Sequence, residues 1–406
     1  MTKDQLPHAA STLLQDNILH YWQTQMTDTQ NGGFYGRRDG HDRLYPKADK
    51  GAILNARILW AFSAAYRVLR RPDYLETATR ARDYLLTHFI DQQYGGVYWS
   101  LDYKGRPVET KKQTYAIGFA IYGLSEYARA TGDQQALQAA IALFHDIEQH
   151  CFDPGAPARP CGYREALTRE WQPIADMRLS DKDENGSRTM NTHLHILEPY
   201  TNLYRVWHDE HLEQQLRTLI HLFTRGPLLN PQTAHLDLFF DDDWQGRRDI
   251  ESYGHDIEAA WLLTEALQVL GDEQLTRQLM PVVGRITRAA EEGLLPDGSM
   301  IHEAKGYSPH SVPTRTDSSR QWWVQCECVI GELNAWQHFS DEAALEKALR
   351  CYDYIDQHLV DHTHGEWHWD IQPDGTVNTV DDKAGFWKCP YHNSRMCLEI
   401  IERLGL

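Results

Sequence analysis

The chain alternates between helices that are apolar almost all round and helices that have a polar face. Residues 51–62 read GAILNARILWAF, in which alanine, leucine and isoleucine fill positions that a surface helix gives to charged residues. A helix with this pattern is buried on most sides. Counted from Asn55, comparable runs recur every 60 to 76 residues and begin near Tyr115, Asn191, His255, Trp322 and Trp387.

More polar, amphipathic helices are predicted between the buried ones, at residues 72–88, 133–150, 211–224, 272–292 and 341–358. A buried and a polar helix together form a helical hairpin, which buries its apolar face only against its neighbours. Alternating inner and outer helices, six of each, predict an all-α fold, an (α/α)6 barrel of six helical hairpins. Because no linker rich in Pro, Gly or Ser interrupts the series, we expect residues 1–406 to form a single domain.

Short β-hairpins are predicted in loops that precede the inner helices. Residues 31–36, 94–99 and 365–371 combine glycine turns with alternating aromatic residues. These hairpins should line one rim of the barrel. The amino termini of all the inner helices open on that same rim, so residues at those ends should meet in a funnel.

Composition and charge argue against a nucleic-acid or membrane partner. The formal net charge is -18 at pH 7, whereas a protein that binds nucleic acid needs a basic face. No secretory signal is visible, and no apolar run approaches the roughly 18 residues of a membrane span. The seven cysteines lack zinc-like spacing and fit reduced thiols. We therefore expect a cytoplasmic monomer or small homo-oligomer, with no nucleic-acid or membrane partner.

Three histidines occupy matching positions at the heads of inner helices: His195, His255 and His392. Glu198 and Glu258 follow the first two by three residues and share their helical faces. There Glu198 would orient His195 and Glu258 would orient His255, fixing the tautomer and raising the basicity of each ring. Imidazoles near their working pKa suit general acid–base chemistry, so the pattern predicts a proton-transfer site.

Other residues near the amino-terminal ends of the inner helices have either a functional or a structural role. Arg57 interrupts an apolar helix, where an unpaired guanidinium is costly; it needs either an anion or a salt bridge to Glu258 or Glu327. His193 lies about 200° around the helix from His195 and is expected to be structural or exposed. Arg395 is expected to pair with a neighbouring carboxylate. Aromatic rings at helix heads either stack on a sugar or belong to the core: Tyr115, Trp322, Trp323 and Trp387.

These motifs resemble those of a known enzyme family. GAILNARILW, NTHLHILEPYTNLYRVW, YGHDIEAAWLL, WWVQCECVIG and DDKAGFWKCPYHNSR look like the motifs of cellobiose 2-epimerases, within the N-acylglucosamine 2-epimerase superfamily of (α/α)6 barrels. The resemblance, over residues 32–404, implies reversible epimerisation at C2 of a reducing-end glucose or mannose unit, with neither metal nor organic cofactor. By this match His255 and His392 correspond to the acid/base pair and His195 to a third essential histidine. Positions that bind or orient the sugar correspond to Arg57, Tyr115, Asn191, Glu258, Trp322 and Trp387.

The implied chemistry fits the residue types. The C2 proton of an aldose becomes removable once the ring opens and the C1 carbonyl appears. Its loss gives a cis-enediolate that must be reprotonated on the opposite face, which needs two bases and a donor to the developing oxyanion. We expect His392 and His255 to exchange the C2 proton, one on each face, and His392 also to open and close the ring. His195 and Arg57 would support the enediolate oxygens.

The substrate length stays open at this point. Residues 304–315 make a longer connection than is usual in the family before the WWVQCE motif, on the rim where a loop can cap the pocket. A capped pocket favours free mannose or glucose, as in the related mannose 2-epimerases. A loop that packs outside leaves room for a β-1,4-linked disaccharide of the cellobiose, lactose or mannobiose type, which we expect.

Rival functions make different demands. An aldose–ketose isomerase of the same superfamily uses the same enediolate but delivers the proton to C1. A glycoside hydrolase needs two carboxylates that flank the scissile bond, such as Glu258 with Glu198 or Asp381, and leaves three histidines unexplained. A metalloenzyme would use the two His-x-x-Glu pairs as ligands. A sugar-binding protein without activity has no need of a proton-transfer set.

Overall fold

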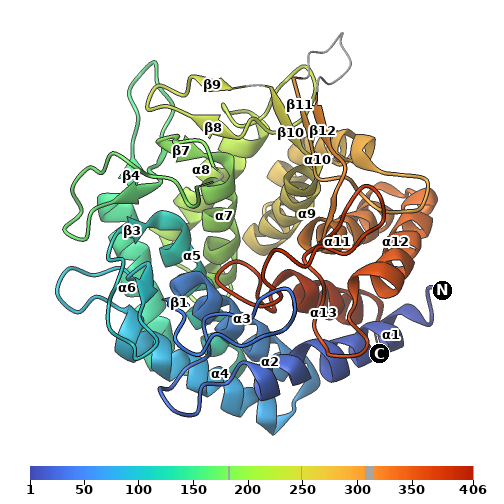
Figure 1. The fold of residues 1–406 in the computed structure, drawn as a ribbon. Coiled ribbons are helices and arrows are strands. Elements are labelled where there is room, and N and C mark those ends of the chain that lie inside the picture. The colour runs from blue at the N-terminus through green and yellow to red at the C-terminus, as the bar shows by residue number, and fades with distance from the viewer. Residues whose placement is uncertain (182, 248, 307–314, 406) are drawn as a thin grey trace.

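Two concentric rings of helices make up this computed structural model, which describes residues 1–181, 183–247, 249–306 and 315–405 (Figure 1). Among these residues six inner helices follow one another around the ring, and the last contacts the first, which confirms the predicted (α/α)6 barrel. They are α3 (Ala52–Leu69), α5 (Thr114–Thr131), α7 (Met190–Tyr204), α9 (Tyr253–Leu270), α11 (Trp322–Phe339) and α13 (His392–Leu404). Although they are rich in apolar residues, no helix in the described ranges is long and apolar enough to cross a bilayer.

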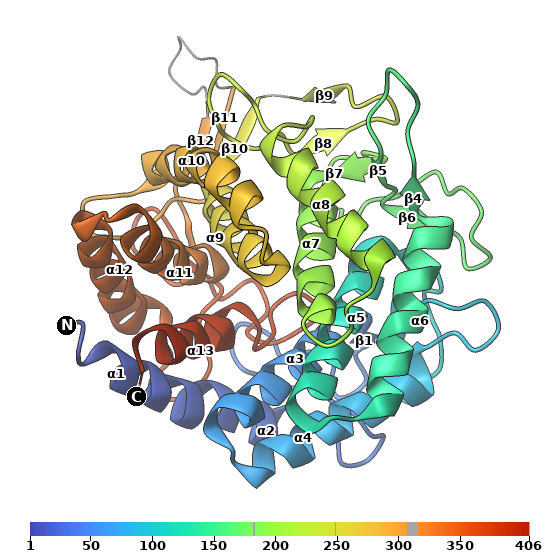
Figure 2. The same ribbon diagram turned by 180° about the vertical axis from the view of Figure 1, so that it is seen from behind.

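The outer ring contains one helix that the sequence analysis did not locate. The predicted outer helices are α4 (Pro72–Tyr84) with η2 (Leu85–Phe89), α6 (Gln134–His150), α8 (Glu210–Thr224), α10 (Glu273–Ala290) with η3 (Glu291–Gly293), and α12 (Glu342–Tyr354) with η4 (Ile355–Leu359). The sixth is amino-terminal: α1 (Leu6–Thr12), η1 (Leu13–Leu19) and α2 (His20–Gln25). It packs against α13 at the other end of the chain (Figure 2), a contact that local sequence does not reveal.

The start of the last inner helix was placed too early. We expected this helix to begin near Trp387, but α13 begins at His392. Pro390 lacks a backbone N–H and disfavours helix at the residue before it, which keeps the preceding segment irregular. Residues 385–388 instead form a loop at the rim of the barrel, and all four line the central cavity.

Short antiparallel strands connect neighbouring hairpins at that rim. The two-stranded pairs are β1 (Lys50–Gly51) with β2 (Ser100–Leu101), β3 (Lys112–Gln113) with β6 (Ala166–Leu167), β4 (Phe152–Asp153) with β5 (Gly162–Tyr163), and β13 (Arg320–Gln321) with β14 (Asp370–Ile371). The three-stranded sheets are β7 (Arg188–Thr189), β8 (Phe239–Phe240) and β9 (Gly246–Arg247), and β10 (Ile250–Ser252), β11 (Glu303–Lys305) and β12 (Arg315–Asp317). Strands β1, β3, β7, β10 and β13 each lead directly into an inner helix. The pairings therefore fix where those helices begin.

The predicted hairpins differ from the observed pairing. Residues 31–36, 94–99 and 365–371 do lie at the rim, but the turns there are closed by single bridges such as Thr27 with Phe34 and Ile90 with Val97. Pairings such as β1 with β2 and β3 with β6 join successive repeats of the barrel. The pairs β4–β5, β8–β9 and β11–β12 lie within one connection. Sequence pattern alone favours pairing between neighbours in sequence, whereas ring closure brings together strands that lie about 50 residues apart.

Only part of the connection 304–315 can be compared with its predicted role. Its ends lie in strands β11 and β12, and residues 307–314 lie outside the described residues. No described residue of this connection lines the central cavity. Both interpretations of residues 304–315, a cap over the pocket and a loop that packs outside it, therefore stay predictions.

A buried ion pair recurs beneath the rim. Lys50 Nζ lies 2.9 Å from Asp28 Oδ2, and Lys112 Nζ lies 2.9 Å from Asp91 Oδ2; all four side chains are buried. Asp28 and Asp91 also accept backbone N–H groups of their own turns. Each pair thus fastens the turn that ends one helical hairpin to the strand that begins the next inner helix.

Replacing Asp91 with Asn should lower the free energy of unfolding by about 3 kcal/mol at neutral pH, because Lys112 would stay buried without its counter-ion. Burial raises the pKa of Asp91, but hydrogen bonds from Arg169 and Lys112 bring that pKa below its usual range. A depressed folded-state pKa contributes stability that is present above about pH 4 and is lost as the pH falls. Urea unfolding between about pH 5 and pH 3 should therefore depend less on pH in the variant.

The matched control is Asp176→Asn. Asp176 is exposed and lies 2.8 Å from Arg178, and an exposed pair of this kind contributes about 0 to 1 kcal/mol. Equal, small losses of stability in the two variants would contradict the role of the buried pair.

Candidate active site

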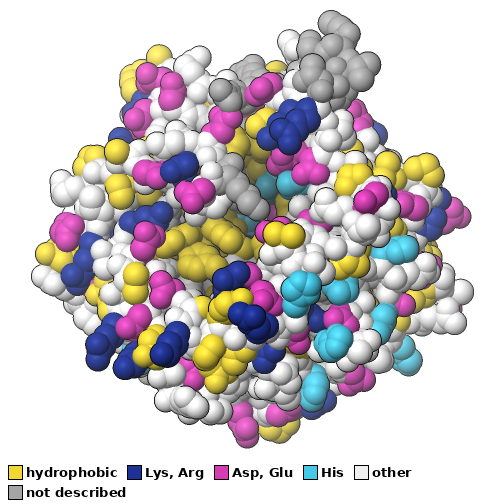
Figure 3. Space-filling view, viewed as in Figure 1, with side chains coloured by type: hydrophobic (Ala, Val, Ile, Leu, Met, Phe, Trp, Pro, Cys, Tyr) yellow, Lys and Arg dark blue, Asp and Glu magenta, His cyan; other side chains and the backbone are white. Residues whose placement is uncertain are grey.

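A cavity of about 520 Å³ opens at the rim that carries the strands, and a hollow walled by hydrophobic side chains marks that face (Figure 3). All six inner helices contribute lining residues from their amino-terminal ends. All nine site residues predicted from the sequence line this one cavity: His195, His255, His392, Arg57, Tyr115, Asn191, Glu258, Trp322 and Trp387. Residues from the heads of different inner helices, far apart in the sequence, therefore lie together in the folded protein.

His195 lies at a kink in α7. Its φ and ψ of −88° and 16° are not helical, because Pro199 lacks the N–H that would bond the His195 carbonyl four residues earlier. Gly118 of α5 accommodates this carbonyl: a Cβ there would lie 2.4 Å from the His195 oxygen. The predicted pairing with Glu198 is confirmed, at 3.0 Å between Nδ1 and Oε2. With Nδ1 engaged, Nε2 is the ring nitrogen available to the cavity.

His255 is oriented by a different residue than predicted. Its Nδ1 lies 2.8 Å from the hydroxyl oxygen of Ser252, at the end of β10, and its ring lies 4.7 Å from that of Trp323. The prediction that Glu258 orients His255 is wrong, because Glu258 Oε1 accepts a hydrogen bond from Arg395 at 2.6 Å. Burial lowers the pKa of His255 to about 3, so the ring is neutral at physiological pH.

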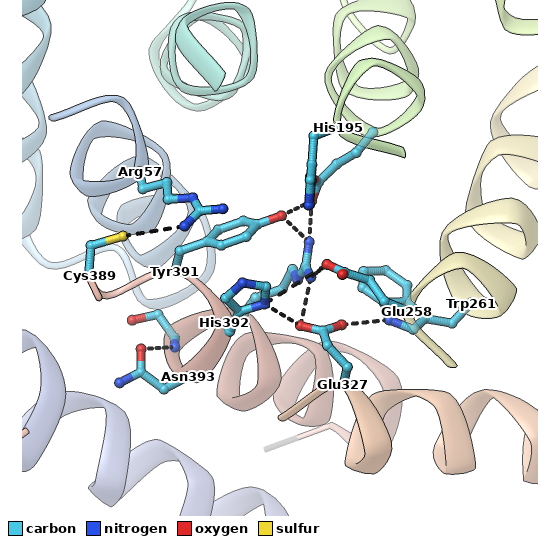
Figure 4. Close-up of polar contacts among 12 residues, drawn as sticks. Arg57, His195, Glu258, Trp261, Glu327, Cys389, Tyr391, His392 and Asn393 are labelled. Atoms are coloured by element: carbon cyan, nitrogen blue, oxygen red, sulfur yellow. Dashed lines mark hydrogen bonds and ion pairs between the residues drawn. The ribbon is translucent and has the colours of Figure 1, made fainter. Parts of the chain in front are cut away.

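His392, the first residue of α13, is held by a carboxylate from α11. Its Nδ1 lies 2.6 Å from Glu327 Oε1, and Figure 4 shows Glu258 and Glu327 together on one side of the ring. Burial, with a smaller contribution from the charge of Arg395, lowers the pKa of His392 well below its usual value. The sequence analysis missed this role of Glu327. The sequence did contain a signal for this role, because Glu327 is a carboxylate inside an apolar helix. Like the guanidinium of Arg57, a buried carboxylate is costly without a partner.

Arg57 faces the cavity without a carboxylate partner among the described residues. Its Nη2 donates to the Tyr115 hydroxyl at 2.8 Å, and Nη1 donates to the Trp387 carbonyl at 3.3 Å. The guanidinium also lies over the Phe119 ring, 4.1 Å from the centroid. The alternative of a salt bridge to Glu258 or Glu327 is therefore wrong. A buried cation of this kind stabilises negative charge that develops in the cavity.

Two polar atoms at the cavity wall are free to bind a ligand. Within the described residues neither Asn191 Oδ1 nor Glu258 Oε2 has a hydrogen-bond partner, and both residues line the cavity. Buried polar atoms are normally satisfied, and a hydroxyl-rich ligand would supply the missing partners. The rings of Trp322 and Trp323 lie 5.3 and 5.7 Å from the ring of His392.

Part of the cavity wall is built from loops in which the sequence analysis named only Asp381, as a carboxylate for the hydrolase alternative. It includes Arg37, Ser180, Asp181, Asp183, Trp369, Asp381 and Asp382. No periodicity marks residues on irregular loops, so only the tertiary structure shows them. His193 is structural, as expected: it is buried, its Nδ1 lies 2.6 Å from the Thr189 carbonyl oxygen, and its Nε2 accepts the Tyr163 N–H.

Ligand atoms of Glu258, Glu327 and His392 lie within 4.8 Å of one another, as a metal site requires. However, Arg395 Nη2 donates to Oε1 of Glu258 at 2.6 Å and to Oε1 of Glu327 at 2.7 Å. The guanidinium thus neutralises the carboxylates in the way that a metal ion would. These residues do not fit a metal ion, because Arg395 occupies the position between the carboxylates.

Comparison with known proteins places the chain among sugar epimerases. The profile of the family described as N-acylglucosamine 2-epimerase (GlcNAc 2-epimerase) matches residues 33–395. The chain is 58% identical over 388 residues to the cellobiose 2-epimerase of Bacteroides fragilis, covering 96% of each. It is 40% identical over 391 residues to that of Ruminococcus albus, covering 96% of this chain and 97% of the relative. The structure of the cellobiose 2-epimerase from Bacillus thermoamylovorans B4167 matches with a TM-score of 0.92 at 40% identity, covering 98% of this chain and 100% of that one.

The imidazole of His255 should stay neutral from about pH 5 to pH 8, because burial holds its pKa near 3. NMR of ¹⁵N-labelled histidine, assigned with a His255→Asn variant, measures this directly. His235 is an internal contrast: burial lowers its pKa, but Asp256 outweighs this and raises it to about 9. His235 should therefore stay protonated over the same range. Titration of His255 near pH 6.5 would contradict the prediction.

Proposed function

The chain belongs to the N-acylglucosamine 2-epimerase family and is an epimerase of the isomerase class; from this membership we propose that it inverts C2 of the reducing-end unit of a β-1,4-linked disaccharide such as cellobiose. Glucose and mannose units are interconverted there through a cis-enediolate after ring opening. One observation carries the proposal: three imidazoles, each with Nδ1 held by a partner, line one cavity together with a guanidinium that has no carboxylate partner among the described residues.

The geometry supports a two-base proton transfer. One imidazole accepts the C2 proton and afterwards releases it to solvent. The other, neutral in the free enzyme, takes up a proton from solvent once the sugar is bound and donates it to the opposite face of C2. We assign this pair as His255 and His392, with His392 also serving ring opening. A held Nδ1 leaves Nε2 of each ring for the sugar. The low pKa values keep an unprotonated base present at neutral pH.

The enediolate oxygens would be stabilised from the other side of the cavity. Arg57 and the Tyr115 hydroxyl lie together, 2.8 Å apart, beside His195. In a site shielded from water, a fixed cation and N–H donors stabilise developing negative charge strongly. We assign His195 and Arg57 to the O1 region. Asn191 and Glu258 would then bind hydroxyls of the same sugar, through the oxygens that lack partners within the described chain.

A disaccharide is favoured over a free monosaccharide by the 58% identity to an enzyme named for cellobiose. The cavity volume of about 520 Å³ lies within the usual range for small-molecule sites, and loop residues such as Trp369 and Asp382 line it together with the helix ends. We also propose a cytoplasmic monomer or small homo-oligomer. All seven cysteines, each of them among the described residues, are free thiols, as a reducing compartment requires.

Cellobiose incubated with the enzyme in D2O, with a chelator present, should be converted into its mannose-ended epimer with deuterium at C2. Proton NMR follows both events, and mannose alone is the parallel substrate. Reaction of mannose but not cellobiose would favour the mannose 2-epimerase alternative. A ketose-ended product would instead indicate an aldose–ketose isomerase, and free glucose a glycoside hydrolase. No reaction with either sugar would overturn the proposal.

His255→Asn and His392→Asn should each lose epimerisation by at least about 10³-fold, since each removes one of two bases. Each variant should still exchange the C2 hydrogen of one epimer, the one whose hydrogen faces the remaining imidazole. The two variants should therefore label opposite epimers when cellobiose and its epimer are incubated separately in D2O.

His193→Asn is the control, because His193 is buried outside the cavity and bonds only to backbone among the contacts described. It should lose stability but keep both exchange reactions. Near-normal turnover in His392→Asn would refute the assignment of the bases.

A further inference from the structure

Arg395 is buried behind the cavity lining, in contact with Glu258, and bonds carboxylates from three other inner helices. It is 1% exposed. Its Nη1 donates to Glu198 of α7, and its Nη2 donates to Glu258 of α9 and Glu327 of α11 at 2.6 and 2.7 Å. Arg395 itself does not line the cavity, so it acts on a ligand only through other side chains.

Two of these carboxylates continue to the imidazoles. Glu198 uses Oε1 for Arg395 and Oε2 for His195 Nδ1. Glu327 uses Oε1 for both Arg395 and His392 Nδ1, while its Oε2 accepts the indole N–H of Trp261 at 2.9 Å. One guanidinium is therefore two bonds away from two imidazoles that belong to different helices.

We propose that Arg395 is a positioning residue of the site: by holding Glu198, Glu258 and Glu327 together, it sets the ring orientations of His195 and His392 for proton transfer. This inference rests on the proposed function. His255 lies outside the network, because Ser252 holds its Nδ1. The network thus separates the three histidines into two that depend on Arg395 and one that does not.

The charges explain why an arginine is needed. Three buried carboxylates surround one guanidinium, and loss of that cation would leave them uncompensated in a dry environment. Burial and the neighbouring Glu327 already raise the pKa of Glu258 well above its usual value. The planar fork of Arg395 presents N–H groups in several fixed directions at once, whereas lysine offers a single compact ammonium.

Arg395→Lys should lower kcat for cellobiose epimerisation by 10- to 100-fold, the usual effect of losing a residue that orients others. KM should change by less than about threefold, because Arg395 does not contact the sugar. The acidic limb of the kcat/KM profile should stay in place, since the positive charge is kept.

Arg395→Met should also move that limb to higher pH. The charge of Arg395 lowers the pKa of His392, so removal of the charge raises this pKa and the base becomes protonated at higher pH. Several charged and titratable groups around His392 remain in the variant. They are Arg57 of α3, Tyr115 of α5, His195 and Glu198 of α7, His255 and Glu258 of α9, Glu327 of α11, and Tyr391 and Lys388 of its own segment.

Arg188→Lys is the matched control. Arg188 is also fully buried and lies 2.5 Å from Asp153, but it does not line the cavity. It should lose stability while its kcat and pH limb stay at wild-type values. Arg395 variants that are folded, by near-ultraviolet circular dichroism, and that keep both kcat and limb would overturn the inference.

A readout without substrate separates this inference from the proposed function and also serves if Arg395→Met does not fold. In ¹⁵N-histidine spectra of Arg395→Lys, the Nδ1 signals of His195 and His392 should shift, and that of His255 should not. Unchanged signals for all three would overturn the inference, whatever the sugar chemistry. Shifted signals in an enzyme that acts on neither cellobiose nor mannose would support the network and reject the proposed function.

Discussion

The buried charge of Arg395 is the interaction on which the site depends. Its guanidinium contacts glutamates from α7, α9 and α11 while belonging to α13, so four of the inner helices are tied together at the floor of the cavity. Apolar packing holds the two rings together but does not specify their register. A hydrogen-bonded ion cluster with fixed directions does, because each carboxylate that loses its place there would remain buried and charged.

The same arrangement explains why the imidazoles are neutral and yet held in place. Every inner helix directs its amino terminus at the cavity, where helix dipoles contribute positive potential. Burial and the two nearby guanidinium groups act in the same direction and lower the pKa of His392. A site with this potential keeps the imidazoles unprotonated when it is empty and stabilises negative charge on a bound ligand, which suits the proposed C2 deprotonation. The carboxylates at Nδ1 of His195 and His392 then fix the ring orientations.

Ring closure places this chemistry at one end of the molecule. Strand pairs such as β1 with β2 fix the start of each inner helix, and buried pairs such as Lys50 with Asp28 fasten the rim turns to those strands. The barrel is closed by the amino-terminal helix against α13. Because α13 carries both His392 and Arg395, the helix that closes the barrel also brings these two residues into the site.

The helix alternation and the barrel follow from the sequence alone, because burial on all sides and a recurring position at helix heads are local patterns. Together with the family resemblance of the motifs, these patterns also identified nine of the residues that line the cavity. Family membership followed from the same motifs. The sequence analysis paired Glu198 with His195 correctly, because residues i and i+3 are neighbours on any helix. It assigned Glu258 to His255 wrongly, and missed Ser252 and the role of Glu327, because a buried cation from another helix competes for the carboxylates. Those pairings are visible only in the folded protein, because the contacts between residues 258, 327 and 395 arise from ring closure and leave no periodicity in the chain.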